Sequence, residues 1–166
     1  MSMLKQHRIW HLGDDVSTDD LAPGHAMKHG LEVIAQHCLE TVLPQFAREA
    51  KRGDVIVAGR NFGIGSSREQ AAQALVHLGI AAVIAPSYSG LFFRNAFNVG
   101  LLLMTCPQSH LLQKEERLAL NSSRPDAIFS HQNELTCEPI PEFLRAMVQH
   151  GGLLAQLRDE YGHHQN

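Results

Sequence analysis

Three short apolar segments alternate with two helical segments in the middle of the chain, and this alternation limits the possible folds more than any other feature. Residues 54–58 (DVIVA), 81–85 (AAVIA) and 101–104 (LLLM) are largely apolar, which is typical of strands buried on both faces. Residues 67–78 and 89–98 predict the helices between them. This order implies parallel strands joined by right-handed crossovers, and so an α/β fold with a parallel βαβαβ core.

The segments before this core are less regular. Residues 8–12 predict a short strand. The stretch that follows, residues 13–24 (GDDVSTDDLAPG), is rich in Gly, Asp, Ser, Thr and Pro and predicts a long irregular loop. Residues 31–50 predict a helical stretch that is interrupted near Pro44, because proline disrupts a helix interior.

The pattern changes after Pro107. Residues 109–120 (SHLLQKEERLAL) predict an exposed helix, and residues 127–140 predict two strands around a polar turn. Pro141 opens a last helical region. We therefore predict one α/β domain over residues 1–166, with a mixed sheet and helices packed against it.

The composition excludes several classes of protein. Lys and Arg number 14 and Asp and Glu 17, and the net charge of −3 comes without a basic tract, which argues against nucleic acid as a partner. No apolar run approaches the roughly 20 residues that a membrane span needs. The first ten residues lack the apolar core of a signal peptide, so we expect a cytoplasmic protein.

The cysteines and histidines do not predict a metal site in this chain. Cys38, Cys106 and Cys137 are far apart and fit no zinc or iron–sulfur spacing, so ordinary buried thiols are expected. The eleven histidines are scattered, and a single histidine is more often a structural residue than a ligand. We expect any metal that this protein works with to be held by another chain.

One polar corner follows the first core strand, in the segment GRNFGIGSSREQAAQAL (residues 59–75). It lacks the lysine of a phosphate-binding P-loop, and Arg68 stands where a dinucleotide-binding loop would need its third glycine. It contains no G-x-S-x-G elbow of a serine hydrolase. Because ligands bind at the carboxyl ends of parallel strands, the corner is nevertheless well placed for a site.

Two interpretations of this corner remain open. Ser66 and Glu69 have the spacing of a helix capping box, which needs no function. A capping box does not explain Arg68, a cation in a first helical turn that favours anions. Nor does it explain three glycines in the seven residues before Ser66 (residues 59–65). Backbone N–H groups, two hydroxyls and a guanidinium together indicate a pocket for a carboxylate.

Three segments in order resemble the small subunit of 3-isopropylmalate dehydratase, which is similar to the swivel domain of the aconitase family. They are GDDVSTDDLAPG, DVIVAGRNFGIGSSREQAAQAL and GIAAVIAPSYSGLFFRNAFNVGLLLM, and the resemblance covers residues 8–106. It implies a swivelling β/β/α domain and a separate large subunit whose cysteines hold a [4Fe–4S] cluster. It also implies reversible loss and gain of water on hydroxy acids, with the open iron of the cluster polarising the departing hydroxyl.

The resemblance also implies roles for individual residues. Ser66 would be the base, as an alkoxide, with Ser67 beside it and Arg68 binding a substrate carboxylate. Thr18 and Asp19 match a Thr-Asp pair, in which Asp19 helps to orient the serine and arginine region; an ordinary loop cap is the alternative for Asp19.

Three other residues also match the family motifs. Lys28 lies in the stretch that recognises the variable end of the substrate, where many relatives have arginine, and a merely solvated lysine is equally compatible. For Arg94 and Asn95 we favour a structural role, because phenylalanines flank them.

The expected function is therefore that of a hydro-lyase small subunit. The reaction we expect is the interconversion of 2- and 3-isopropylmalate in leucine synthesis. Homoaconitate, citraconate, methylmalate and dimethylmalate are alternative substrates, and a non-catalytic anion-binding module of the same fold is an alternative from another class.

Overall fold

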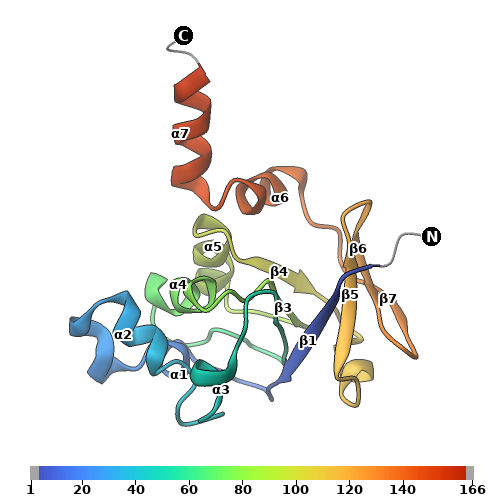
Figure 1. Cartoon of the computed structure of the whole chain (residues 1–166), viewed down its shortest axis with the longest axis horizontal. Helices are drawn as coiled ribbons and strands as arrows, with labels where there is room; N and C mark the ends of the chain where they lie inside the picture. The colour runs from blue at the N-terminus through green and yellow to red at the C-terminus, as the bar shows by residue number, and fades with distance from the viewer. Residues whose placement is uncertain (1–3, 164–166) are drawn as a thin grey trace.

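A seven-stranded mixed sheet runs through residues 4–163, the part of the chain that the computed structural model describes (Figure 1). The strand order is β4-β3-β2-β1-β5-β6-β7. Strands β1 to β4 are parallel, whereas β5, β6 and β7 are added in antiparallel pairs. The strands are β1 (Gln6–His11), β2 (Val55–Val57), β3 (Ala82–Ala85), β4 (Leu102–Thr105), β5 (Arg117–Asn121), β6 (Arg124–Phe129) and β7 (Glu134–Thr136).

Strand β1 joins the two halves of the sheet. The second half of β1 pairs in parallel with β2, so that Ile9 lies opposite Val55. The first half pairs antiparallel with β5, so that Gln6 lies opposite Ala119. The predicted α/β fold with a mixed sheet and a parallel core is confirmed.

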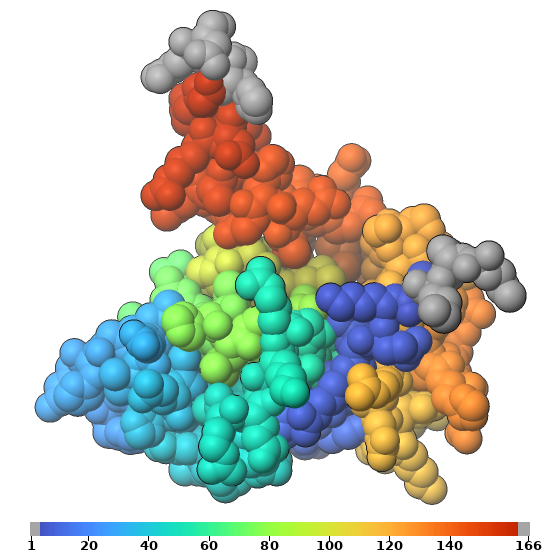
Figure 2. Space-filling model, viewed as in Figure 1, coloured from blue at the N-terminus to red at the C-terminus, as the bar shows by residue number. Residues whose placement is uncertain are grey.

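Helices α4 and α5 form the crossovers between the core strands, as predicted. The α-helices are α1 (Thr18–Leu21), α2 (Leu31–Gln36), α3 (Phe46–Glu49), α4 (Glu69–His77), α5 (Gly90–Asn98), α6 (Glu142–Gln149) and α7 (Leu153–His163), with 3₁₀ helices η1 (Gly24–His29) and η2 (Ser109–Leu112). Helices α1, α2 and α5 contact α4, and α6 contacts α5. Helix α7 extends away from the rest of the molecule, which the space-filling view shows clearly (Figure 2). None of these helices, within residues 4–163, is long and apolar enough to cross a bilayer.

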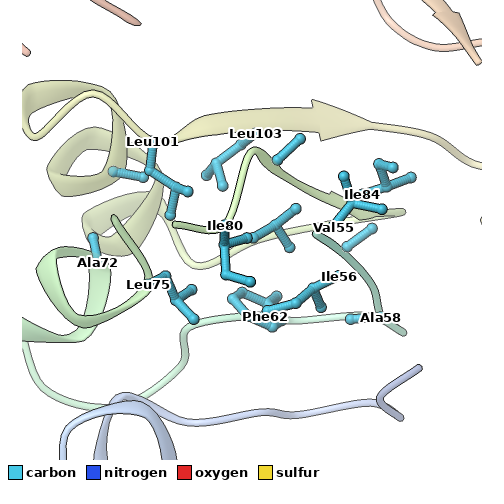
Figure 3. Packing of buried hydrophobic residues seen from close by; sticks show 14 of the residues in the cluster. Val55, Ile56, Ala58, Phe62, Ala72, Leu75, Ile80, Ile84, Leu101 and Leu103 are labelled. Carbon is cyan, nitrogen blue, oxygen red and sulfur yellow. The ribbon is translucent and has the colours of Figure 1, made fainter. Parts of the chain in front are cut away.

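The core lies between the parallel strands and the helices that connect them. Leu75 of α4 packs close to Ile56 of β2 and to Phe62, and Leu101 and Leu103 lie at the other side of the same cluster (Figure 3). These five side chains are all buried. Burial of this apolar surface fixes α4 against the sheet, and with it the loop that precedes α4.

The predicted helix over residues 109–120 is wrong. Only Ser109–Leu112 forms a short 3₁₀ helix, and Arg117–Asn121 is strand β5. Leu118 and Ala119 are buried where β5 pairs with β1 and β6. Long-range pairing and burial therefore override the local helical preference of a segment rich in Leu, Lys and Glu.

The predicted helical stretch over residues 31–50 is shorter than expected. Helix α2 ends before Pro44, because Leu39 is in the left-handed region with φ 61° and is fully buried, and its N–H donates to the carbonyl of Asp20 at 2.8 Å. Only Phe46–Glu49 returns to helix. The predicted loop over residues 13–24 is also more ordered than expected, since it contains α1.

Candidate active site

The loops that follow β1 and β2 run side by side at the carboxyl ends of the parallel strands. The N–H of Gly63 donates to the carbonyl of Val16 at 2.7 Å, and the N–H of Thr18 donates to the carbonyl of Ile64 at 2.7 Å. Residues far apart in sequence are thereby held in register across the two loops. This pairing brings the Thr-Asp segment to the glycine–serine–arginine corner.

Two of the glycines in the corner are required by close contacts. Gly63 has φ +84°, and a Cβ atom there would overlap the ring of Phe92. Gly65 has φ +114°, and a Cβ atom there would lie 2.9 Å from the Thr18 hydroxyl. L-residues with side chains rarely adopt such φ values. The glycines therefore allow the second loop to approach both α5 and the Thr18 side chain.

Replacing Gly63 with alanine is expected to lower the free energy of unfolding by about 2–4 kcal/mol, from backbone strain together with overpacking against Phe92. Urea unfolding followed by circular dichroism measures this. Gly90→Ala is the matched control, because a Cβ atom at Gly90 would meet nothing within 4 Å. Equal stability of the two variants would contradict the described contact of Gly63 with Phe92.

Thr18 and Ser66 meet where the two loops pair. Their hydroxyl oxygens are 3.3 Å apart, within hydrogen-bonding distance. Thr18 is buried, whereas Ser66 and Ser67 are exposed. The carbonyl of Ser67 accepts a hydrogen bond from the Asn95 amide at 3.2 Å. This bond ties α5 to the corner and leaves both serine hydroxyls on an open face.

Arg68 and Asp19 form an ion pair next to this hydroxyl pair. The Nη1 atom of Arg68 donates to Oδ1 of Asp19 at 2.9 Å and to the carbonyl of Ala22 at 2.9 Å. Oδ1 of Asp19 also accepts from the N–H of Gly24 at 3.0 Å. The Arg68 guanidinium, and then the Gly24 N–H, lower the pKa of Asp19, so this carboxyl is ionised at neutral pH.

The donors of Arg68 are only partly used. A guanidinium has five N–H donors, and within the described residues the hydrogen bonds of Arg68 leave from Nη1. The Arg68 side chain is 29% exposed. The edge formed by Nε and Nη2 has the geometry that matches a carboxylate with two parallel hydrogen bonds.

The capping box predicted at Ser66 and Glu69 is wrong. Helix α4 begins at Glu69, its N-cap residue is Arg68, and no side chain caps it. A capping box is present instead at the start of α1, where Ser17 Oγ accepts from the N–H of Asp20 and Asp20 Oδ2 accepts from the N–H of Ser17. Ser17 and Asp20 have the spacing of a capping box in the sequence, but this segment was predicted to be an irregular loop, so the start of a helix was missed there. The Ser66 hydroxyl is thus not used to begin a helix.

The other residues that match the family motifs, Lys28, Arg94 and Asn95, lie outside the glycine–serine–arginine corner. Lys28 is exposed on η1 and, within the described part of the chain, forms neither an ion pair nor a side-chain hydrogen bond. Asn95 holds the carbonyl of Ser67, which agrees with its predicted structural role, and Arg94 is exposed on α5. The structure therefore brings Thr18, Asp19, Ser66 and Arg68 together and leaves Lys28 to one side.

The cysteines of this chain do not fit an iron–sulfur cluster. Cys38, Cys106 and Cys137 are all buried. Burial raises the pKa of the Cys38 thiol, which disfavours the thiolate that iron requires. Cys106 and Cys137 lie next to each other, whereas Cys38 follows α2. This donor set does not converge on one open position, as a cluster would need.

Comparison with known proteins identifies the family. A family model described as the aconitase C-terminal domain matches residues 25–109, which is just over half of the chain. The chain belongs to the aconitase C-terminal domain family. The match includes the core strands, α4, α5 and the glycine–serine–arginine corner, so the family resemblance read from the sequence is confirmed.

Relatives within the aconitase C-terminal domain family cover nearly the whole chain. The small subunit 1 of 3-isopropylmalate dehydratase from Archaeoglobus fulgidus is 40% identical over 150 residues, or 89% of this chain and 92% of the relative. The methanogen homoaconitase small subunit from Methanothermobacter thermautotrophicus is 38% identical, covering 89% of this chain and 86% of the relative. The prediction of an aconitase-family hydro-lyase subunit is confirmed at this level.

A solved structure agrees with the fold. The crystal structure of 3-isopropylmalate dehydratase from Methanocaldococcus jannaschii superposes with a TM-score of 0.87 at 34% identity, covering 98% of each chain. The antiparallel β5–β7 half and the terminal helices, which lie beyond the matched family domain, therefore also have a counterpart in that structure.

Proposed function

We propose that this chain is the small subunit of a cytoplasmic two-chain hydro-lyase that interconverts 2- and 3-isopropylmalate. The main support for this proposal is the exposed residue Ser66 beside the Arg68–Asp19 ion pair, at the carboxyl ends of β1 and β2. The reaction is supported by relatives that are named as small subunits of 3-isopropylmalate dehydratase. On this proposal the whole chain, residues 1–166, acts as one swivel domain against a large subunit that holds the [4Fe–4S] cluster.

Arg68 would bind and orient a carboxylate of the substrate. Asp19 and the carbonyl of Ala22 fix the guanidinium through Nη1, so that the Nε and Nη2 edge can face the ligand. Because Asp19 is held at Nη1 of Arg68, it does not compete with the substrate carboxylate for the Nε and Nη2 edge of the guanidinium. A carboxylate held here has its neighbouring carbon close to the serine hydroxyls, with Ser67 as a further hydrogen-bond donor.

Ser66 would move the proton on the carbon next to that carboxylate. In dehydration the Ser66 alkoxide would take the proton at Oγ while the hydroxyl on the adjacent carbon leaves as hydroxide, for which the cluster of the large subunit would supply a Lewis acid; in rehydration the Ser66 hydroxyl would return the proton. The Thr18 hydroxyl, 3.3 Å from Ser66 Oγ, can donate a hydrogen bond to the alkoxide. Lys28 would contribute to recognition of the variable substrate side group when the large subunit brings that group over η1.

Reconstitution with the cognate large subunit tests the reaction. The pair is assayed for dehydration of hydroxy acids with four to seven carbons, including 3-isopropylmalate and the methylated malates, and for hydration of homoaconitate. The expected result is the highest kcat/KM on isopropylmalate. Highest activity on homoaconitate would favour the second candidate, which the homoaconitase relative supports. If the pair neither dehydrates nor hydrates any of these acids, the hydro-lyase proposal is overturned.

Replacing Arg68 with lysine is expected to lower kcat/KM by about 10- to 100-fold, mainly through a higher KM, because a bidentate contact becomes a single one. Steady-state kinetics of the reconstituted pair measure this. Arg60→Lys is the matched control, since Arg60 lies on the same loop with its side chain 74% exposed and pairs only loosely with Asp14 at 3.7 Å. An equal change in both variants would contradict the role of Arg68.

A further inference from the structure

Three side chains of the metal-binding types converge beside the candidate active site. Nε2 of His25 lies 2.6 Å from Oε1 of Glu40, and Nδ1 of His37 lies 2.6 Å from Oε2 of the same carboxylate. The two imidazole rings are 4.9 Å apart and nearly perpendicular. One donor atom from each of the three residues lies within 4.8 Å of the other two. Scattered in the sequence, these residues form a compact triangle of donors in the fold.

We propose that His25, His37 and Glu40 form a binding site for a divalent transition-metal cation, with Zn²⁺ as the best-fitting ion. Two imidazole nitrogens and one carboxylate oxygen are a donor set that zinc accepts, with a water in the fourth position. The charges are also compatible with a divalent cation. The one carboxylate neutralises part of its charge, and the two imidazoles bind as neutral ligands. His25 is 60% exposed, which provides an entry path for the cation and room for the water.

The distances between the donors are compatible with this ion. Zinc lies about 2.0–2.2 Å from nitrogen and oxygen ligands, so tetrahedral donors are about 3.3 Å from one another. The two imidazole-to-carboxylate distances are shorter than this, as expected where an N–H proton occupies the space between them. When a cation displaces those two protons, each imidazole nitrogen has to move from 2.6 Å to about 3.3 Å from the carboxylate oxygen.

Buried neighbours hold the backbone of the three donors in place. Leu39, between His37 and Glu40, is fully buried, and its φ of 61° turns the chain so that Glu40 comes back over His37. The N–H of Glu40 donates to the carbonyl of His37 at 3.2 Å and closes this turn. Ala26, next to His25, is also fully buried. The irregular backbone that ends α2 early is therefore what creates the cluster.

A cation at this position would fasten η1 to the turn after α2. Gly24, the first residue of η1, donates to Asp19, and Lys28 lies in the same 3₁₀ helix. The cation would therefore stabilise the segment that supports the Arg68–Asp19 ion pair, without contacting the reacting atoms. This inference does not depend on the proposed reaction, because it concerns only binding by this chain.

Zinc binding by the full chain tests the site. The purified chain, with any affinity tag removed and after treatment with a chelator, is titrated with Zn²⁺ by calorimetry. We expect one site whose affinity falls at least about tenfold in His25→Ala and in Glu40→Gln, since even the loss of supporting groups around a metal costs 10- to 100-fold. His131→Ala is the matched control, because His131 is exposed on the loop between β6 and β7, outside the cluster, and it should bind as the unchanged chain does.

Cobalt provides a second readout that does not depend on activity. Co²⁺ bound by the unchanged chain is expected to give visible absorption of a low-coordinate site, and Glu40→Gln should lose it. Circular dichroism shows whether each variant is folded, and Glu40→Gln keeps the size of the side chain. The proposal is overturned if the unchanged chain fails to bind Zn²⁺, or if His25→Ala and Glu40→Gln bind it as tightly as the unchanged chain does. Either result would show that the three side chains are only hydrogen-bonded to one another. The hydro-lyase proposal would not be affected.

Discussion

Replacing Ser66 with alanine is expected to lower kcat of the reconstituted enzyme by about 10²–10⁴-fold, the usual contribution of a positioned general base. Ser66 Oγ is exposed, does not cap α4, and lies 3.3 Å from the Thr18 hydroxyl. Because alanine keeps the Cβ atom and removes only the hydroxyl of an exposed residue, stability should change little. The loss should therefore appear in kcat while KM for the substrate stays nearly constant.

Single-turnover and steady-state measurements on the same large subunit preparation distinguish this effect from poor assembly. Ser89→Ala is the matched control, because Ser89 stands at the start of α5 and its side chain makes no capping hydrogen bond. Ser67→Ala should give a smaller loss, seen mostly in KM. Wild-type turnover in Ser66→Ala would show that another group moves the proton.

The purified chain alone is expected to have no dehydratase activity, even with added iron and sulfide. A helix N-terminus stabilises an anion by about 1 kcal/mol and at most about 2, which lowers the pKa of an alcohol by only one or two units. In water that is far too little to ionise a serine near neutral pH. Ser66 and Ser67 are exposed in this chain, so the exclusion of water must come from a second protein that covers the corner.

A progress curve for product formation tests this requirement. The chain is measured alone, with iron and sulfide, and with the large subunit, at equal concentrations of the chain. Turnover should begin only in the third mixture. Dehydration by the first or the second mixture would refute the division of the active site between two chains.

The sequence predicted the parallel core well because local and long-range preferences agree there. Residues 55–58 (VIVA) and 81–85 (AAVIA) are apolar throughout, and in the fold both faces of these strands are covered. Each of these two segments is followed by a helix, and Gly79 and Gly100 stand just beyond the ends of α4 and α5 with φ of +85° and +87°, as helix-terminating glycines do. Local pattern was sufficient for these elements.

Local pattern failed where pairing across the chain decides the structure. Arg117–Asn121 has helical composition, but the open edge of β1 makes it a strand. The approach of Thr18 to Ser66 depends on two loops that pair through Gly63 and Ile64, which no spacing rule specifies. Only the family resemblance placed those segments together. The meeting of His25 with Glu40 was missed for the same reason, because it depends on a left-handed turn at Leu39.

Strand β1 has a consequence for the order in which the fold can assemble. It is synthesised before the other strands of this sheet, yet one of its neighbours is β2 and the other is β5, which is synthesised much later. The four parallel strands can associate while one side of β1 still has unpaired backbone groups. That side is completed only when the last third of the chain folds back onto it. Contacts between such distant residues favour slow folding, and a nascent chain with an open edge is a natural client for a chaperone.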